Sequence, residues 1–262
     1  MLEIYFNTLQ PLSGKEHKSV PVHQLFFHRL TGGRLREFYE NTEILLPGNT
    51  LQFEQLAEMK WRINGLEYQD TINELIHRAI ALLNPEIGSN IPSIIGHGDA
   101  HNGNVFVDEY KGELIYFDPA FAGRHSPFLD LTKPLFHNVF AMWMYFPKEI
   151  AAELSINWEI KDGKMVVEHD FKPSPIRVSF LRSKIERVLK PLLADLQSKN
   201  WLNPCWREYL KLALFCCPFL TMNLSDRVKF PPEITLLGLA ISVEMGSRSL
   251  GDVDSFLDEQ LG

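Results

Sequence analysis

The chain has 262 residues, a length that suits one large domain or two small ones. With 45% hydrophobic, 11% aromatic and 23% charged residues, it has the composition of an ordinary packed globular protein, which excludes disorder, collagen and a coiled coil as descriptions of the whole. A net charge of −7, without any cluster of Lys and Arg, argues against a nucleic-acid partner.

The sequence predicts neither a membrane span nor a secretory signal. The longest uncharged apolar run, 212–224, is far shorter than the roughly 20 residues of a membrane span. The segment 1–5 lacks a basic stretch followed by an apolar one, as a signal peptide would have. The adjacent Cys216 and Cys217 are expected to pack as small hydrophobic residues. We therefore expect a cytoplasmic, reduced protein without a membrane partner.

The N-terminal part of the chain mixes strand and helix signals. The runs 2–6 and 20–30 are rich in β-branched and aromatic residues, and each is predicted to be a strand. The glycine pair 32–33 ends the second run and provides a bend. Apolar residues at helical spacing then predict helices over 34–41, 51–61 and 66–83.

The remainder reads as a small β portion within a helical body. The short apolar run 92–96 precedes a polar stretch, and the segments 105–107 and 114–117 are predicted to pair as a hairpin. A second hairpin is predicted around the Asp162-Gly163 turn. Helices are predicted over 128–145, 147–154, 175–198, 206–221 and 232–247. The Met142–Tyr145 stripe is expected to belong to the core. The predicted fold class is α+β.

Three side chains around the first hairpin form a candidate site. Asp99 lies in the polar loop, while Asn104 and Asp118 flank the hairpin and should meet at one edge. Asn104 and Asp118 can supply the oxygen ligands that Mg²⁺ prefers, leaving Asp99 free to accept a proton from a substrate hydroxyl or to orient that hydroxyl. Asp99 and Asn104 also have the spacing of the protein-kinase catalytic loop. The alternative is that the loop merely collects turn-forming residues.

A family resemblance emerges from these motifs in order. The string HGDAHNGN at 97–104, the hairpin, FDPAFAG at 117–123 and PFLDL at 127–131 resemble the aminoglycoside phosphotransferase and choline kinase superfamily. The close match covers about residues 94–132. Those enzymes have a protein-kinase-like fold and phosphorylate hydroxyl groups of small molecules. The resemblance implies that Asp99 is the catalytic aspartate and that Asn104 and Asp118 bind Mg²⁺, with ATP as phosphate donor.

The same resemblance assigns supporting roles to three further residues. His97 would be structural, His101 would line the loop, and Asp130 would be a buried brace for it. Asp130 also suits a favourable charge at a helix N-terminus, and the two roles are compatible. His97 and His101 are weak candidates for metal ligands. Two metal-binding histidines at i and i+4 normally lie on a helix with a glutamate next to the first, whereas glycines occupy this loop.

The resemblance also bears on domain organisation. Segment 22–30 is similar to the last strand of a kinase N-lobe followed by the hinge, which implies that His28, Arg29 and Leu30 face the adenine of ATP. Residues 1–30 would then be an N-lobe remnant, and 31–262 a C-lobe with a helical substrate subdomain. We find no Gly-rich loop, strand lysine or helix glutamate before this segment, so a separate chain or segment is expected to supply the N-lobe.

Two functions follow from these observations. The first is Mg²⁺-dependent transfer of the ATP γ-phosphate to a hydroxyl of a small molecule, supported by Asp99, Asn104 and Asp118 together. The alternative is a kinase-fold binding or regulatory protein without efficient turnover, because the N-lobe is incomplete. An aminoglycoside, an amino alcohol, a sugar and other metabolites all remain open as phosphate acceptors.

Overall fold

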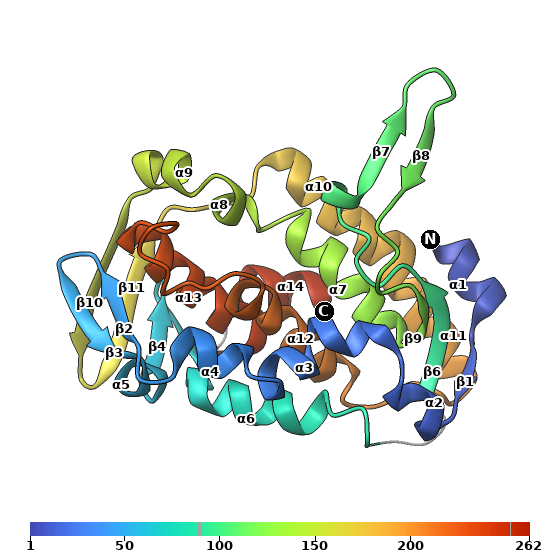
Figure 1. Cartoon of the computed structure of the whole chain (residues 1–262), viewed down its shortest axis with the longest axis horizontal. Coiled ribbons are helices and arrows are strands. Elements are labelled where there is room, and N and C mark those ends of the chain that lie inside the picture. Colours follow the sequence, from blue (N-terminus) through green and yellow to red (C-terminus); the bar gives the residue numbers. More distant parts are fainter. Residues whose placement is uncertain (88–90, 252) are drawn as a thin grey trace.

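The computed structural model describes residues 1–87, 91–251 and 253–262. Within these residues, the chain is mainly helical with four small sheets, so the predicted α+β class is confirmed. A sheet of β1 (Gln10–Leu12), β6 (Ile91–Gly96) and β9 (Gly123–His125) lies at one end of the helical body, and a five-stranded sheet lies at the other (Figure 1).

Two apolar helices form the centre of the molecule. Helix α12 (Trp206–Thr221) packs against α13 (Pro232–Gly246), and most side chains of both are buried. Helices that are apolar all round have to be enclosed by other elements. Here α7 (Pro127–His137) and α6 (Ile72–Leu82) cover α12 (Figure 1).

The predicted C-terminal helices are confirmed, with two interruptions. The helix predicted over 128–145 is divided into α7 and α8 (Met142–Tyr145). The one predicted over 175–198 contains a π-helical turn at Ile185–Leu189. The other helices of this part are α9 (Pro147–Glu153), α10 (Pro175–Lys184), α11 (Lys190–Ser198) and α14 (Phe256–Leu261).

The strands predicted near the N-terminus are wrong. Residues 2–6 lie in helix α1 (Leu2–Thr8), and the run 20–30 forms a 3₁₀ helix, Pro21–Leu25, followed by α3 (Phe27–Thr31). The buried side chains explain the second difference, because Val22, Leu25, Phe26 and Leu30 recur at helical rather than alternating spacing. Helices α2 (Gly14–Lys18) and α4 (Arg34–Tyr39) complete this part, the latter as predicted.

The helix predicted over 51–61 is confirmed only over α5 (Phe53–Ala57), and the one over 66–83 begins too early. The first region also contains the end of β3 (Asn49–Gln52) and the start of β4 (Lys60–Ile63), and β2 (Glu43–Leu46) precedes it. The second begins with β5 (Leu66–Tyr68) before α6. The Asn64-Gly65 pair, with φ of 49° and 81°, joins β4 to β5 and is a strong hairpin signal.

The five-stranded sheet combines distant segments in the order β10-β11-β4-β5-β12. Strands β10 (Ile156–Lys161) and β11 (Lys164–His169) form the hairpin predicted around Asp162-Gly163. Strand β11 pairs in parallel with β4, whereas β12 (Ser249–Leu250) pairs antiparallel with β5. The sheet therefore ties three separate parts of the chain together.

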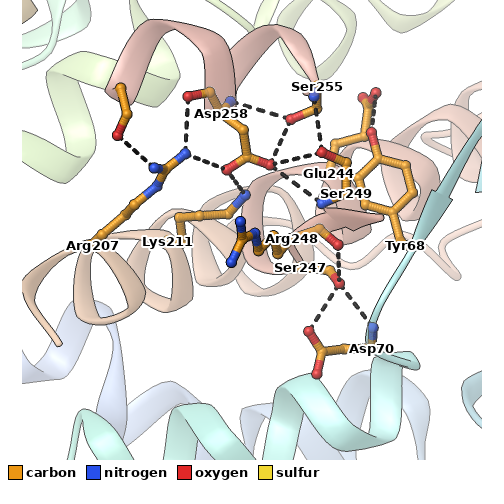
Figure 2. Close-up of polar contacts among 11 residues, drawn as sticks. Tyr68, Asp70, Arg207, Lys211, Glu244, Ser247, Arg248, Ser249, Ser255 and Asp258 are labelled. Carbon is orange, nitrogen blue, oxygen red and sulfur yellow. Dashed lines mark hydrogen bonds and ion pairs between the residues drawn. The ribbon is translucent and has the colours of Figure 1, made fainter. Parts of the chain in front are cut away.

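A buried polar network fixes the C-terminal helix (Figure 2). The Asp258 carboxylate of α14 accepts hydrogen bonds from Lys211 Nζ at 2.6 Å, Ser255 Oγ at 2.9 Å and Arg207 Nη2 at 3.2 Å. These donors neutralise and satisfy an otherwise costly buried charge. The pKa of Asp258 is lowered because Lys211 and the hydrogen bonds outweigh the effect of burial.

The hairpin predicted after the polar loop is confirmed. Strands β7 (Val105–Asp108) and β8 (Glu113–Tyr116) pair antiparallel and project from the body (Figure 1). Within the part of the chain that the structure describes, every helix is too short or too polar to cross a lipid bilayer. The predicted division of the chain at residue 30 stays a prediction.

Candidate active site

A glycine allows the chain to turn from β6 into the polar loop. Gly98 has φ of +78°, and a Cβ added there would lie 2.5 Å from the carbonyl oxygen of Phe121. Its backbone N–H donates to Asp130 Oδ1 at 2.7 Å. A side chain at this position would meet both conformational strain and a steric clash, so the loop requires glycine here.

Hydrogen bonds bring the loop and the end of the hairpin together. Asn104 Nδ2 donates to the backbone oxygen of Asp99 at 3.0 Å, and Asn104 accepts at its own backbone oxygen from the Phe117 N–H at 3.1 Å. Asp118 follows Phe117 directly and is exposed, with φ of +56°. The structure therefore places the backbone of Asp99, Asn104 and Asp118 at one edge of the hairpin.

The two loop histidines have different partners. The imidazole of His97 donates from Nε2 to the Phe117 carbonyl oxygen at 2.9 Å, and its Nδ1 accepts from the Asp99 N–H at 3.3 Å. His101 accepts a hydrogen bond at Nδ1 from the Gly103 N–H at 3.0 Å. Burial lowers the pKa of His101, although Asp99 acts in the opposite direction.

The two oxygens of the Asp99 carboxylate have different surroundings. Oδ1 is buried and has no hydrogen-bond partner among the described residues, while Lys133 Nζ and His101 Nε2 each lie 3.7 Å away. The side chain as a whole is 15% exposed. Because Oδ1 contributes almost nothing to that exposure, Oδ2 is the oxygen that Asp99 presents to the outside.

Helix α7 contributes polar residues that the sequence reasoning missed. Lys133 is only 2% exposed, and its Nζ lies 3.3 Å from His137 Nε2. His137 Nδ1 is in turn 2.6 Å from the hydroxyl oxygen of Tyr145, a residue that was expected in the core but is 42% exposed. In the sequence, the sign of this pair was a lysine and a histidine at helical i,i+4 spacing in a mainly apolar helix.

The end of α7 also braces the loop. Asn138 Oδ1 accepts from the Asn102 N–H at 2.7 Å, and the Asn138 backbone oxygen accepts from Arg177 Nη1 at 2.7 Å. Helix α10, which carries Arg177, is therefore linked to the loop through a single asparagine. The sequence offered no sign of this link, because it depends on tertiary packing.

Asp130, for which the resemblance implies the role of a brace, is 2% exposed. Besides the Gly98 N–H, its carboxylate accepts hydrogen bonds from His125 Nε2 at 3.0 Å and from the Tyr5 hydroxyl. Burial alone would raise the pKa of Asp130, but the His125, Tyr5 and Gly98 donors outweigh it and lower the pKa. These contacts tie α1, β9 and the loop to the first turn of α7.

The structure does not bring His28, Arg29 and Leu30 together as a hinge. They lie in α3, where the His28 carbonyl oxygen accepts from the Gly32 N–H and the Arg29 and Leu30 N–H groups donate to Phe26. Leu30 is buried and lines a cavity of about 440 Å³ that none of the Asp99 site residues line, whereas His28 is exposed. Burial and Arg34 lower the pKa of Arg29, while Asp99 acts in the opposite direction.

The chain was also compared with known proteins. The family model described as the phosphotransferase enzyme family matches residues 31–162, just over half of the chain. No curated protein and no solved structure matches in the other two comparisons. The matched range contains the loop, the hairpin and the residues of α7 that surround Asp99. The chain therefore belongs to the phosphotransferase enzyme family.

Proposed function

We propose that the protein transfers the γ-phosphate of ATP to a hydroxyl of a small molecule, with Mg²⁺ as cofactor. The observation that carries this proposal is the link from Asp99 through Asn104 to the residue preceding Asp118. Phosphoryl transfer depends mainly on positioning and electrostatics, so it needs a group that orients the attacking hydroxyl and ligands for a cation. These three side chains supply both.

The donor chemistry fits a magnesium ion. Asn104 uses Nδ2 to bind the backbone of Asp99, which leaves its amide oxygen free as a ligand, and Asp118 adds an exposed carboxylate. Across the described residues, no group of three or more His, Cys, Asp and Glu side chains forms a metal cluster. Two protein ligands suit Mg²⁺, which commonly completes its shell with phosphate oxygens and water. When bound, Mg²⁺ would neutralise phosphate charge.

Asp99 is proposed to orient the acceptor. Its Oδ1 is directed inward, close to Lys133 and His101, so Oδ2 is free to accept a hydrogen bond from the attacking hydroxyl and to take its proton. Of the three residues predicted to bind nucleotide, Arg29 has the best support, because it is a cation whose pKa is raised by the Asp99 carboxylate, against the larger effects of burial and Arg34. A cation there suits an anionic phosphate.

A partner is proposed to cover the projecting hairpin. Phe106, Val107, Leu114 and Ile115 of β7 and β8 are each more than half exposed. Exposed apolar side chains along a hairpin that projects from the body favour an interface with another protein element. We propose that a separate chain or segment with the role of a kinase N-lobe docks here and encloses the phosphates.

Free thiols are compatible with a cytoplasmic location, which we also propose. Cys216 and Cys217 are buried in α12, as predicted, and Cys205 is exposed without a disulfide partner. Disulfides are rare in the cytosol because thiols are kept reduced there.

The function is tested by measuring phosphate transfer from [γ-³²P]ATP and Mg²⁺ to kanamycin, ethanolamine and ribose, one for each open class of acceptor. We expect labelled product from at least one acceptor. Asp99→Asn should reduce that rate by about 10²–10⁴-fold, the usual range for a general base. Asp108→Asn, an exchange within the hairpin and away from the loop, serves as the control. Equal rates for wild type and Asp99→Asn, or no product from any acceptor, would contradict the proposal.

A further inference from the structure

Lys133 is an unusual residue for the inside of an apolar helix. It lies in the middle of α7, between a buried Thr132 and a buried Pro134, and is 2% exposed. Burial lowers the pKa of its amine, while the Cys217 thiol and the Asp99 carboxylate act in the opposite direction. Lys133 Nζ and His101 Nε2 each lie 3.7 Å from the buried Oδ1 of Asp99. A buried amine beside a buried carboxylate is best satisfied as an ammonium ion, because the charge of the carboxylate then faces an opposite charge.

The ammonium ion determines which nitrogen of His137 carries the proton. An ammonium group has donors and no lone pair, so Lys133 must donate to His137 Nε2 across the 3.3 Å contact. Burial and the Lys133 charge hold the pKa of His137 well below its ordinary value, which keeps the imidazole neutral. A neutral imidazole that accepts at Nε2 has its proton on Nδ1. His137 therefore donates to the Tyr145 oxygen, 2.6 Å away.

Because the hydrogen bonds run from Lys133 to His137 and from His137 to Tyr145, the hydroxyl proton of Tyr145 is not used within this chain. The hydroxyl oxygen is the acceptor in its contact with His137, so the O–H itself must find another acceptor. The side chain is 42% exposed, and its hydroxyl is close enough to Asp99 for the carboxylate to help raise the pKa of Tyr145 to about 12, an effect caused mainly by burial. The phenol thus stays protonated at neutral pH and can donate at the outer side of the site.

We infer that Lys133 and His137 hold the Tyr145 hydroxyl as a hydrogen-bond donor to the phosphate acceptor beside Asp99. This inference rests on the proposed function. Tyr145 contacts the substrate, whereas Lys133 and His137 are positioning residues that act through it. The acceptor molecule then needs two features close together: a hydroxyl that donates to Asp99 Oδ2, and an oxygen with a lone pair for Tyr145. A polyol or sugar has such neighbouring oxygens, whereas the ammonium group of a simple amino alcohol has no lone pair to offer.

The first test reads the proton on His137 without any turnover. Long-range ¹H–¹⁵N correlation spectra of the imidazole nitrogens, assigned with His137→Asn, should show a protonated Nδ1 and an unprotonated Nε2 in the wild type at neutral pH. Lys133→Met should abolish this preference. A proton on Nε2, or a doubly protonated ring, in the wild type would overturn the inference.

The second test measures the contact with substrate. Tyr145→Phe should raise KM for ribose about tenfold, the loss expected for one hydrogen bond, while KM for Mg-ATP stays unchanged. Tyr110→Phe, at the exposed hairpin turn, is the matched control. Because Lys133 is buried, folding of Lys133→Met is checked by circular dichroism, and Tyr145→Phe carries the test if that variant does not fold.

The outcomes separate the inference from the proposed function. If wild type transfers phosphate to ribose, Asp99→Asn does not, and Tyr145→Phe equals wild type in its KM for ribose, the inference is wrong and the function stands. The inference is also wrong if ethanolamine alone among the three acceptors is phosphorylated. If no acceptor is phosphorylated, the proposed function fails, and the imidazole spectrum alone then decides the arrangement of Lys133, His137 and Tyr145.

Discussion

The side-chain amide of Asn104 donates a hydrogen bond to the backbone carbonyl oxygen of Asp99, with 3.0 Å between Nδ2 and the oxygen. This contact fixes which end of the amide is engaged and leaves the Asn104 oxygen as the available ligand atom. It also couples the shape of the loop to the metal position. A change at Asn104 should therefore affect both the shape of the loop and cation binding, whereas a change at Asp118 should affect only cation binding.

The first prediction concerns Asp118 and its left-handed backbone. Asp118→Asn should abolish Mg²⁺-dependent nucleotide binding in isothermal titration without destabilising the fold, because Asn tolerates the φ of +56°. Asp162→Asn is a matched control, since Asp162 has φ of +52° in the β10–β11 turn. Asn104→Ala should weaken binding less, because a neutral amide holds a dication less strongly than a carboxylate does. Mg²⁺-dependent binding that survives in Asp118→Asn would rule out the proposed ligand.

Gly98 and Gly112 provide a paired test of loop geometry. Gly112→Ala should lower the free energy of unfolding by about 1–2 kcal/mol, the cost of a left-handed residue, because its φ is +66° and no atom lies near the added Cβ. Gly98→Ala should lower the free energy of unfolding further, since the added Cβ would also clash with the Phe121 carbonyl oxygen. Urea denaturation monitored by fluorescence would measure both. Equal decreases in the free energy of unfolding for the two variants would show that the loop moves to relieve the clash with Phe121.

Asp130 should make stability depend on pH in a defined direction. Its pKa is lowered in the folded state, so its contribution is fully present above the ordinary unfolded value near 3.9 and is lost as pH falls through the folded pKa. Asp130→Asn should cost about 3–5 kcal/mol at pH 7, as expected for breaking a buried charge network. The difference from wild type should shrink below about pH 4. A difference that grows with acidity in urea denaturation would contradict this assignment.

The affinity of this chain alone for nucleotide should be weak. Residues 2–31 form helices and strand β1, which pairs with β6, and with Gly14 as their one glycine they contain no glycine-rich loop. Charge-assisted contacts contribute about 1.5–3 kcal/mol each. Their loss predicts a millimolar Kd for Mg-ATP. Titration calorimetry with and without EDTA measures it, and a micromolar Kd would mean that other residues clamp the phosphates.

The hairpin and the loop were predictable because local chemistry decides them. The 105–117 segment has apolar runs separated by a glycine-containing turn, and the site motif depends on residues close in sequence. The same local reasoning should have found the β4–β5 hairpin, where Asn64-Gly65 was overlooked because the flanking apolar residues also fit a helix.

Other features depend on tertiary packing and could not be predicted from the sequence. The run 20–30 has the composition of a strand, yet its apolar residues are buried on a helix against the core. The contact of Lys133 with Asp99, and that of Tyr145 with His137, joins side chains from separate elements or from opposite sides of a bend. Composition favours neither contact, because a lysine in an apolar helix is normally expected to reach solvent.

The parallel pairing of β11 with β4 has a consequence for how the chain can be divided. The family match ends at residue 162, within the turn between β10 and β11, and Lys60 pairs with Lys164 just beyond it. A fragment that stops at the family boundary would leave β4 as an open edge, and it would lack α12, against which α7 packs. The part of the chain that carries the family signature is therefore not an autonomous folding unit. Truncation at residue 162 should yield a fragment that aggregates. Refolding of the whole chain should be limited in rate by formation of the long-range contact between β11 and β4.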